Sequence, residues 1–364
     1  MAANVTRFLS SRTAPVVFIV LSASLFGVGT PLAKILVDDI DPVVLAGLLY
    51  VGAFVGLSIY AGLARVSRGD RTRSASLGRK DAPWLTGATI SGGIVAPICL
   101  MTGLTLTTGF AASLLLNLEG LVTALIAYAF FKENLGWRLG IAVVCMTAAG
   151  VILSWDPGSG AISVGGPLLM LAAGIAWGVD NNLTRHISCK SPVQIAQVKG
   201  AVAGTVSLSI AVLLGLNVPA DRSLILALVL GSICYGASLA LFVQALQGMG
   251  ASRAGMFFSI GPFVGAIVSI VLLDEWLGWM MLPAAGLMLV GVVVIVYERH
   301  SHIHGHEGIT HAHLHSNDEP SHDHGHPAPV NGQHVHEHTH HPESHDHVHW
   351  PDIHHRHDHE KGDD

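Results

Sequence analysis

The sequence predicts an all-α polytopic membrane protein: ten transmembrane helices in two inverted five-helix repeats, followed by a disordered His-rich tail. Three observations predict it, namely ten long apolar runs, a motif that occurs twice, and a change of composition at His300. A helix that crosses the hydrocarbon core needs about 20 apolar residues. The ten runs of about that length are 15–37, 43–63, 83–103, 109–131, 137–155, 166–186, 193–216, 223–247, 254–273 and 280–297.

An internal duplication relates the two halves of the chain. Residues 133–137, Glu-Asn-Leu-Gly-Trp, return 142 positions later as residues 275–279, Glu-Trp-Leu-Gly-Trp. Nearer the start of each half, Phe26-Gly27-Val28 agrees with Trp177-Gly178-Val179, 151 positions on. Because five is odd, the second repeat must cross the membrane in the opposite sense to the first. Inverted repeats of this kind are typical of secondary transporters, whose two halves form one central site.

The repeats define the domain organisation. We expect an N-terminus over 1–14, a first repeat over 15–155, a second repeat over 166–297 and the tail over 298–364.

Charged loop residues predict the orientation, since Lys and Arg are enriched on the cytoplasmic side. The short loop 64–82 alone carries six of them, Arg65, Arg68, Arg71, Arg73, Arg79 and Lys80. Loops on the opposite side are acidic, as at Asp38, Asp39 and Asp41. Both termini are therefore expected to lie in the cytoplasm.

A similar ending closes each half of the chain: residues 112–119, Glu133 to Trp137 and Gly150 in the first half, and residues 261–263, Glu275 and Gly291 in the second. With these endings the chain resembles the EamA branch of the drug/metabolite transporter superfamily. Residues 177–185 are also similar to a bacterial EamA subgroup with His-rich tails, which implies a bacterial cytoplasmic membrane as the location. The resemblance implies a transporter, and members of the family export amino acids, other metabolites or toxic compounds.

Glu119 is the main candidate functional residue, because it lies near the middle of the fourth apolar run. An acidic residue at mid-bilayer costs about 2.5–3.5 kcal/mol, so such residues usually face a bundle interior and serve a function. Either it stays protonated, or it pairs with a cation or a substrate amine. The structural alternative is a neutral Glu that is hydrogen-bonded between helices. Its counterpart in the second repeat is Gly261, so the site is asymmetric.

A second polar group lies in the sixth apolar run. Its candidate substrate or coupling residues are Asp180, Asn181 and Asn182, and Lys199 and Gln244 join them from the seventh and eighth runs. The structural alternative is contact with a neighbouring helix for Asp180, Asn181 and Gln244, and for Lys199 it is a basic anchor at the cytoplasmic end of its helix.

Other residues in the body are assigned structural roles. The four GxxxG pairs, Gly52/Gly56, Gly174/Gly178, Gly200/Gly204 and Gly261/Gly265, are expected to allow close helix packing. Glu133 and Glu275 are expected to cap or tether turns. Four prolines inside apolar runs free backbone carbonyls that another helix or a water-filled cavity must satisfy, either along the transport path or at a simple packing kink. They are Pro31, Pro97, Pro262 and Pro283.

The tail holds 22 of the 23 histidines together with 12 acidic residues. Imidazole suits Zn, Ni, Co and Cu ions, and spacing of two places ligands on one side of an extended chain. The candidate ligands are His300, His302, His304, His306, His311, His313, His315, His322, His324, His326, His334, His336, His338 and His340. Incidental metal binding by a solvated low-complexity tail, and pH sensing, are the alternatives.

The sequence favours export of a small organic metabolite or amino-acid-like compound, with the tail as a metal-binding regulator. The alternatives are transition-metal efflux, with the tail as ion collector, and a membrane anchor for a metal buffer or sensor. No nucleophile–base set or cofactor fingerprint is present, so we expect no enzyme and no required cofactor. The expected partners are the lipid bilayer, a small-molecule substrate and divalent transition-metal ions, without nucleic acid. A homodimer is compatible with the sequence.

Overall fold

The computed structural model describes most of the body and parts of the tail. The described residues are 14–68, 77–131, 137–156, 161–188, 190–249, 254, 257–275, 279, 281–296, 300–305, 310–315, 334–339 and 344–349.

The first half forms five helical segments, as predicted. The first two are α2 (Ala14–Val37) and α3 (Pro42–Arg68). The third combines η1 (Arg79–Asp81), α4 (Ala82–Ala88), η2 (Thr89–Val95) and α5 (Ala96–Leu106). The fourth combines α6 (Gly109–Leu115) and α7 (Leu118–Phe131), and the fifth is α8 (Trp137–Leu153). Apolar runs form helices here because a helix satisfies its own backbone hydrogen bonds without water.

The second half repeats this order after a short antiparallel pair, β1 (Trp155–Asp156) and β2 (Ala161–Ile162). Its first two helices are α9 (Gly165–Arg185) and α10 (Pro192–Leu213). The next segment combines α11 (Arg222–Leu230), η3 (Gly231–Ala237) and α12 (Ser238–Met249). The last two are α14 (Ile260–Leu273) and α15 (Met281–Val296). The predicted fold class is confirmed, and the boundaries agree within a few residues.

The described helices differ in how well each could cross a bilayer alone. By length and composition, five could do so: Ala14–Val37, Pro42–Ala64, Arg79–Leu106, Pro192–Leu213 and Arg222–Leu246. Four shorter apolar helices are Gly109–Thr123, Gly140–Leu153, Ile260–Leu273 and Met281–Val294. The α9 helix is in neither group, and it carries the predicted polar residues Asp180, Asn181 and Asn182.

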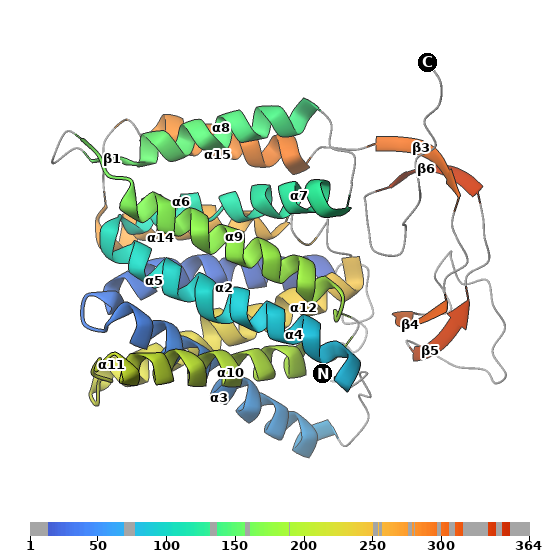
Figure 1. The fold of residues 1–364 in the computed structure, drawn as a ribbon, viewed down its shortest axis with the longest axis horizontal. Coiled ribbons are helices and arrows are strands. Elements are labelled where there is room, and N and C mark those ends of the chain that lie inside the picture. Colours follow the sequence, from blue (N-terminus) through green and yellow to red (C-terminus); the bar gives the residue numbers. More distant parts are fainter. Residues whose placement is uncertain are drawn as a thin grey trace.

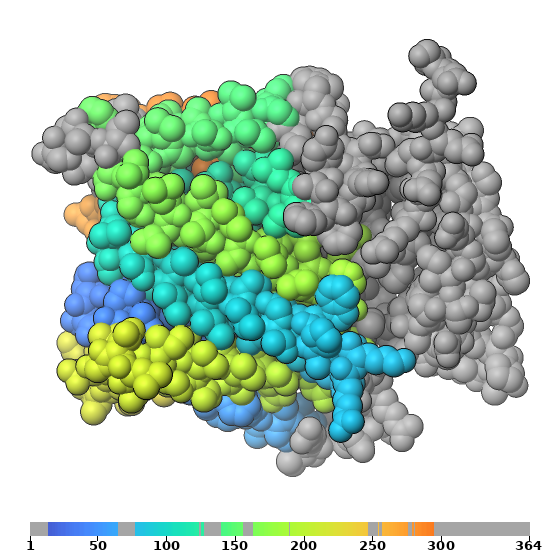
Figure 2. Space-filling model, in the orientation of Figure 1, coloured from blue at the N-terminus to red at the C-terminus, as the bar shows by residue number. Residues whose placement is uncertain are grey.

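The packing of the helices follows the duplication (Figure 1). Three contacts join a segment to its own counterpart: α3 to α10, α6 to α14, and α8 to α15. The α2 helix packs against α12 and α14, and its counterpart α9 packs against α5 and α7. Figure 2 shows α9 of the second half lying between first-half segments. The two repeats are therefore interleaved around a common centre.

The surface of the bundle is apolar, as a lipid-facing surface must be. Val144, Leu213 and Val271 are 68%, 85% and 80% exposed. Inside, the predicted GxxxG pairs do allow close packing. A Cβ added at Gly200 would lie 2.9 Å from the Tyr50 carbonyl oxygen, and one added at Gly204 would lie 2.7 Å from the Val51 side chain.

Two irregular features occur at the same place in each repeat. The π-helical turns η2 and η3 begin at Thr89 and Gly231, which are 142 positions apart. The helices α7 and α14 begin at Leu118 and Ile260, again 142 positions apart. The sequence predicts an unbroken fourth helix over 109–131, and the structure corrects this. The Asn117 side chain donates to the Leu114 carbonyl, a local bond that competes with the helix.

Glu275 acts as the cap that the sequence predicts, but on a distant helix. Its two carboxylate oxygens accept hydrogen bonds from the backbone N–H groups of Gly109 and Phe110, each at 2.8 Å, at the start of α6. Asp274 ends α14 in the left-handed conformation. Glu275 thereby links the end of α14, in the second repeat, to the start of α6, in the first. Glu133 lies outside the described residues.

The described parts of the tail are strands, where the sequence predicts disorder in the absence of a ligand. The strand β3 (His300–Gly305) pairs with β6 (Ser344–His349), and β4 (Thr310–His315) pairs with β5 (His334–Thr339), both antiparallel. Histidine at every second position has the period of a strand, which accounts for the extended conformation.

Candidate functional site

A cavity lies between the two repeats, with polar and aromatic side chains around it. The space open to the centres of water-sized spheres is about 70 Å³. One water molecule needs about 10–15 Å³ by that measure, so the cavity has room for several waters or a small solute. Its lining residues are Phe26, Tyr50, Ala53, Glu119, Trp177, Asp180, Asn181, Ala196, Lys199, Tyr235, Ser238, Leu239, Phe242 and Phe258.

Aromatic rings form much of the wall. Phe26 lies among three of them, with ring centroids 5.5 Å from Trp177, 6.0 Å from Tyr235 and 5.5 Å from Phe258. Phe242 extends the cluster through Phe258 at 5.0 Å. Ring pairs at these separations attract one another by about 0.5–1.5 kcal/mol beyond their burial.

Glu119 forms the first polar group of the cavity. It occupies the first turn of α7, immediately after the break in the fourth segment, and it is half-buried. The Asn181 side-chain amide on α9 donates to Glu119 Oε1 at 2.7 Å. The positive end of the α7 dipole favours a negative charge at this position. A broken helix near mid-membrane that presents its N-terminus to a cavity is a recurrent arrangement in transporters.

Asp180 and Lys199 form the second polar group, a buried ion pair. Lys199 Nζ lies 2.6 Å from both Asp180 oxygens, and the two residues are 1% and 5% exposed. The Thr184 hydroxyl also donates to Asp180, at 2.8 Å. Each ion taken out of water costs several kcal/mol, and only close, well-bonded pairing offsets that cost.

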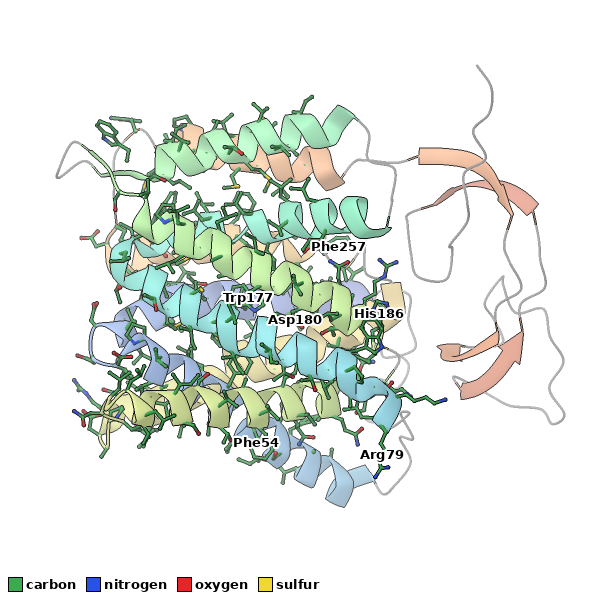
Figure 3. All side chains as sticks on the ribbon, viewed as in Figure 1. Phe54, Arg79, Trp177, Asp180, His186 and Phe257 are labelled. Atoms are coloured by element: carbon green, nitrogen blue, oxygen red, sulfur yellow. The ribbon has the colours of Figure 1, made fainter. Side chains whose placement is uncertain are left out.

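The Gly92 carbonyl oxygen accepts hydrogen bonds from cavity residues of both repeats. The η2 turn bonds residue 96 back to residue 91, and in the same register the partner of Gly92 would be Pro97, which has no N–H. The Tyr50 hydroxyl at 2.7 Å and Trp177 Nε1 at 3.0 Å donate to the freed carbonyl instead. Figure 3 labels Trp177 and Asp180 along the same helix. Gly92 must be small, because an added Cβ would collide with Asp180.

The structure brings together four of the six candidates in the body: Glu119, Asp180, Asn181 and Lys199. It does not bring in the other two. Asn182 is buried on another face of α9, where it donates to the Gly178 carbonyl at 2.8 Å, because neighbouring helix positions differ by about 100°. Gln244 is exposed on α12 and does not line the cavity.

Of the candidate metal ligands in the tail, His306, His322, His324, His326 and His340 lie outside the described residues. The others lie in the tail strands. Within the described residues, no group of three or more His, Cys, Asp or Glu side chains is placed to hold an ion.

Sequence reasoning missed the aromatic residues of the cavity. One signal was available, since Phe26 and Trp177 are counterparts in the repeat and both reach the cavity. The other rings, such as Tyr50 and Tyr235, carry no pattern that separates them from packing residues. An aromatic residue in an apolar run can pack in the core, face the lipid or line a site, so the sequence alone does not identify the rings of the cavity.

The EamA-like transporter family matches residues 13–155 and 164–297 of this chain, one match for each repeat. The chain belongs to the EamA-like transporter family. This shows a multi-pass membrane protein of a transporter family, as the motifs indicate, and each family match covers one of the interleaved halves.

Relatives of this EamA-like protein agree with the assignment. An uncharacterized transporter of Methanothermobacter thermautotrophicus is 28% identical over 293 residues, which cover 77% of this chain and 85% of the relative. The putative permease-like protein YdzE of Bacillus subtilis is 30% identical over 74 residues, covering 20% of this chain and 95% of that protein.

A crystal structure of another protein shares the fold. It superposes with a TM-score of 0.59 at 19% identity, covering 78% of this chain and 96% of the other.

Proposed function

We propose that this EamA-like protein is a secondary transporter that exports a small organic metabolite or amino-acid-like compound by alternating access. The observation that carries the proposal is the position of Glu119, which faces a cavity lined by both repeats. In this proposal the cavity is the transport site, and Glu119 carries the coupling or substrate charge. Asp180, Asn181 and Lys199 hold the polar part of the site in place.

Alternating access needs two halves that can move against one another around a shared site. The cavity fits that requirement, because Phe26 and Tyr50 come from the first repeat and Trp177 and Lys199 from the second. We place both termini in the cytoplasm, because the basic loop residues Arg79 and Lys80 are exposed and such residues are enriched on the cytoplasmic side. The similarity of residues 177–185 to a bacterial EamA subgroup supports a bacterial cytoplasmic membrane.

A cysteine at position 181 tests whether the cavity is accessible to solutes. In a Cys-free background, Asn181→Cys is expected to react with a small water-soluble maleimide, because residue 181 lines the cavity. Transported substrate is expected to slow the reaction. Labelling is measured by the mass shift of the purified protein.

Asn182→Cys is the matched control, one position further along the same helix. It is expected to stay unreactive, since Asn182 is 8% exposed and bonded to its own helix. Equal reactivity at the two positions, or inertness at 181 from both sides of the membrane, contradicts the proposed path.

We further propose that the tail binds several divalent transition-metal ions and regulates the transport body. At three to four ligands each, 22 histidines can hold roughly five to seven ions. Calorimetry with zinc is expected to show these sites in the full-length protein and not in a chain that ends at Arg299. Binding is expected to weaken as the pH falls through about 6.5, because protonated imidazole does not bind metal.

Transport by the truncated chain separates this proposal from metal efflux. If the tail is regulatory, the truncated chain is expected to keep its transport activity, and that activity is expected to no longer depend on metal. If truncation abolishes transport altogether while the protein still inserts and folds, the regulatory role is contradicted and the tail as ion collector is favoured.

A further inference from the structure

The hydrogen-bond donors around the cavity are almost all engaged by the protein itself. Lys199, the cation of the described lining, lies 2.6 Å from both oxygens of Asp180. Tyr50 and Trp177 both donate to the Gly92 carbonyl, and the Ser238 hydroxyl donates to the Ser22 carbonyl at 2.9 Å. A bound anion needs several donors, and here it would have to displace internal acceptors to obtain them.

The main hydrogen-bond acceptor of the lining, the carboxyl group of Glu119, is in contrast only partly engaged by the protein. In the described part of the chain, Glu119 accepts one side-chain hydrogen bond, from Asn181, and forms no ion pair. Because Asp180 and Lys199 neutralise each other, the net charge of the lining is set by Glu119. The Tyr235 hydroxyl, also in the described lining, has no hydrogen-bond partner, so it can accept a hydrogen bond from a bound molecule or donate one to it.

The aromatic wall of the cavity also favours a cation over an anion. Aromatic faces carry partial negative charge, and they attract a cation that comes within about 6 Å of the ring centroid. The ring of Phe26 lies 5.5 Å from that of Trp177 and 6.0 Å from that of Tyr235, centroid to centroid, and all three line the same cavity as Glu119. The cavity therefore combines one carboxyl group, apolar ring faces and few available donors.

We infer that the substrate of this cavity is a small organic cation, a protonated amine or quaternary ammonium with an apolar or ring-shaped part. The charged nitrogen lies at Glu119 and the apolar part lies against Phe26 and Trp177. This rests on the proposed function, in that the cavity is taken as the transport site, and it narrows the substrate from metabolites in general to cations.

Three probes of similar shape and different charge test the inference: 2-phenylethylammonium, 2-phenylethanol and phenylacetate. Calorimetry at pH 7 on the purified full-length protein measures the binding of each one. The ammonium is expected to bind about 10- to 100-fold more tightly than the alcohol, the range that a charge-assisted hydrogen bond supplies. Phenylacetate is expected to bind most weakly.

Glu119→Gln is expected to bring the ammonium and the alcohol to similar affinity. The control Asp39→Asn makes the same acid-to-amide change at an exposed position outside the cavity, and it is expected to keep the preference. If Glu119→Gln fails to fold, the ranking of the three probes in the unaltered protein still decides. Phenylacetate binding as tightly as the ammonium, no binding of the ammonium at millimolar concentration, or an unchanged preference in Glu119→Gln overturns the inference.

The failure of this inference is distinguishable from the failure of the proposed function. A protein that shows proton-driven flux but prefers phenylacetate remains a transporter with a different substrate class. If the protein binds the ammonium selectively but shows no flux in proteoliposomes, the inferred cation preference of the cavity is supported and the proposed transport function is contradicted.

Discussion

Replacing Glu119 by Gln is expected to abolish pH-dependent transport in proteoliposomes while expression and folding are preserved. Gln has nearly the same shape as Glu and keeps a side-chain oxygen that can accept the hydrogen bond from Asn181. It cannot gain or lose a proton, so the step that couples flux to the proton gradient is lost. The measurement is substrate flux driven by an imposed pH difference, which is expected to fall to the level of empty liposomes.

The Asp39→Asn variant is the control, since it removes an exposed acid at the end of the bundle away from the cavity. Its flux is expected to match that of the unaltered protein. Flux at the normal rate in Glu119→Gln contradicts the coupling role. It would instead favour the structural alternative, in which Glu119 holds α7 to α9 by its hydrogen bond with Asn181.

Replacing Lys199 by Met is expected to have the largest effect on stability. The change leaves Asp180 buried with its neutral donor Thr184 but without its cation, although Met fills much of the same volume. Breaking a buried pair by removing one partner costs about 3–5 kcal/mol, because the remaining charge is uncompensated. The measurement is the free energy of unfolding of the purified protein in detergent.

The double variant Asp180→Asn, Lys199→Met tests the reason for the loss. With both charges removed, most of the stability is expected to return, because neither residue is left as an unpaired buried ion. A loss below about 1 kcal/mol in the single variant, the usual value of an exposed ion pair, contradicts the burial of this pair. Equal losses in the single and double variants contradict the charge-based explanation.

The architecture was predictable because its signals are local and strong. A membrane core accepts only segments that satisfy their own backbone, so run length and hydropathy predict where a helix lies. The predicted run 15–37 became α2 over 14–37, and the motif spacing of 142 positions located both the repeats and, as it emerged, their irregular turns. The break at Asn117 was not predicted, because a single polar residue in an apolar run is compatible with an unbroken helix.

The site was predictable only as a set of candidates. The free-energy cost of placing a charged side chain in the membrane identifies Glu119, Asp180 and Lys199, since such residues are rare inside a bilayer without a function or a partner. That cost does not indicate which of these residues contact one another. Gln244 has the same polarity as residues that line the cavity, and yet it is exposed on α12.

The sequence by itself determined the number and order of the spanning segments and their duplication. It also identified the polar residues whose placement in the membrane costs the most free energy. The tertiary structure alone decided the pairs: Lys199 with Asp180, and Asn181 with Glu119, 62 positions away. It also decided that Asn181 faces the cavity and Asn182 does not. The physical reason is that neighbouring positions on a helix point about 100° apart, so the rotation of each helix, set by packing against its neighbours, determines which side chain reaches the site.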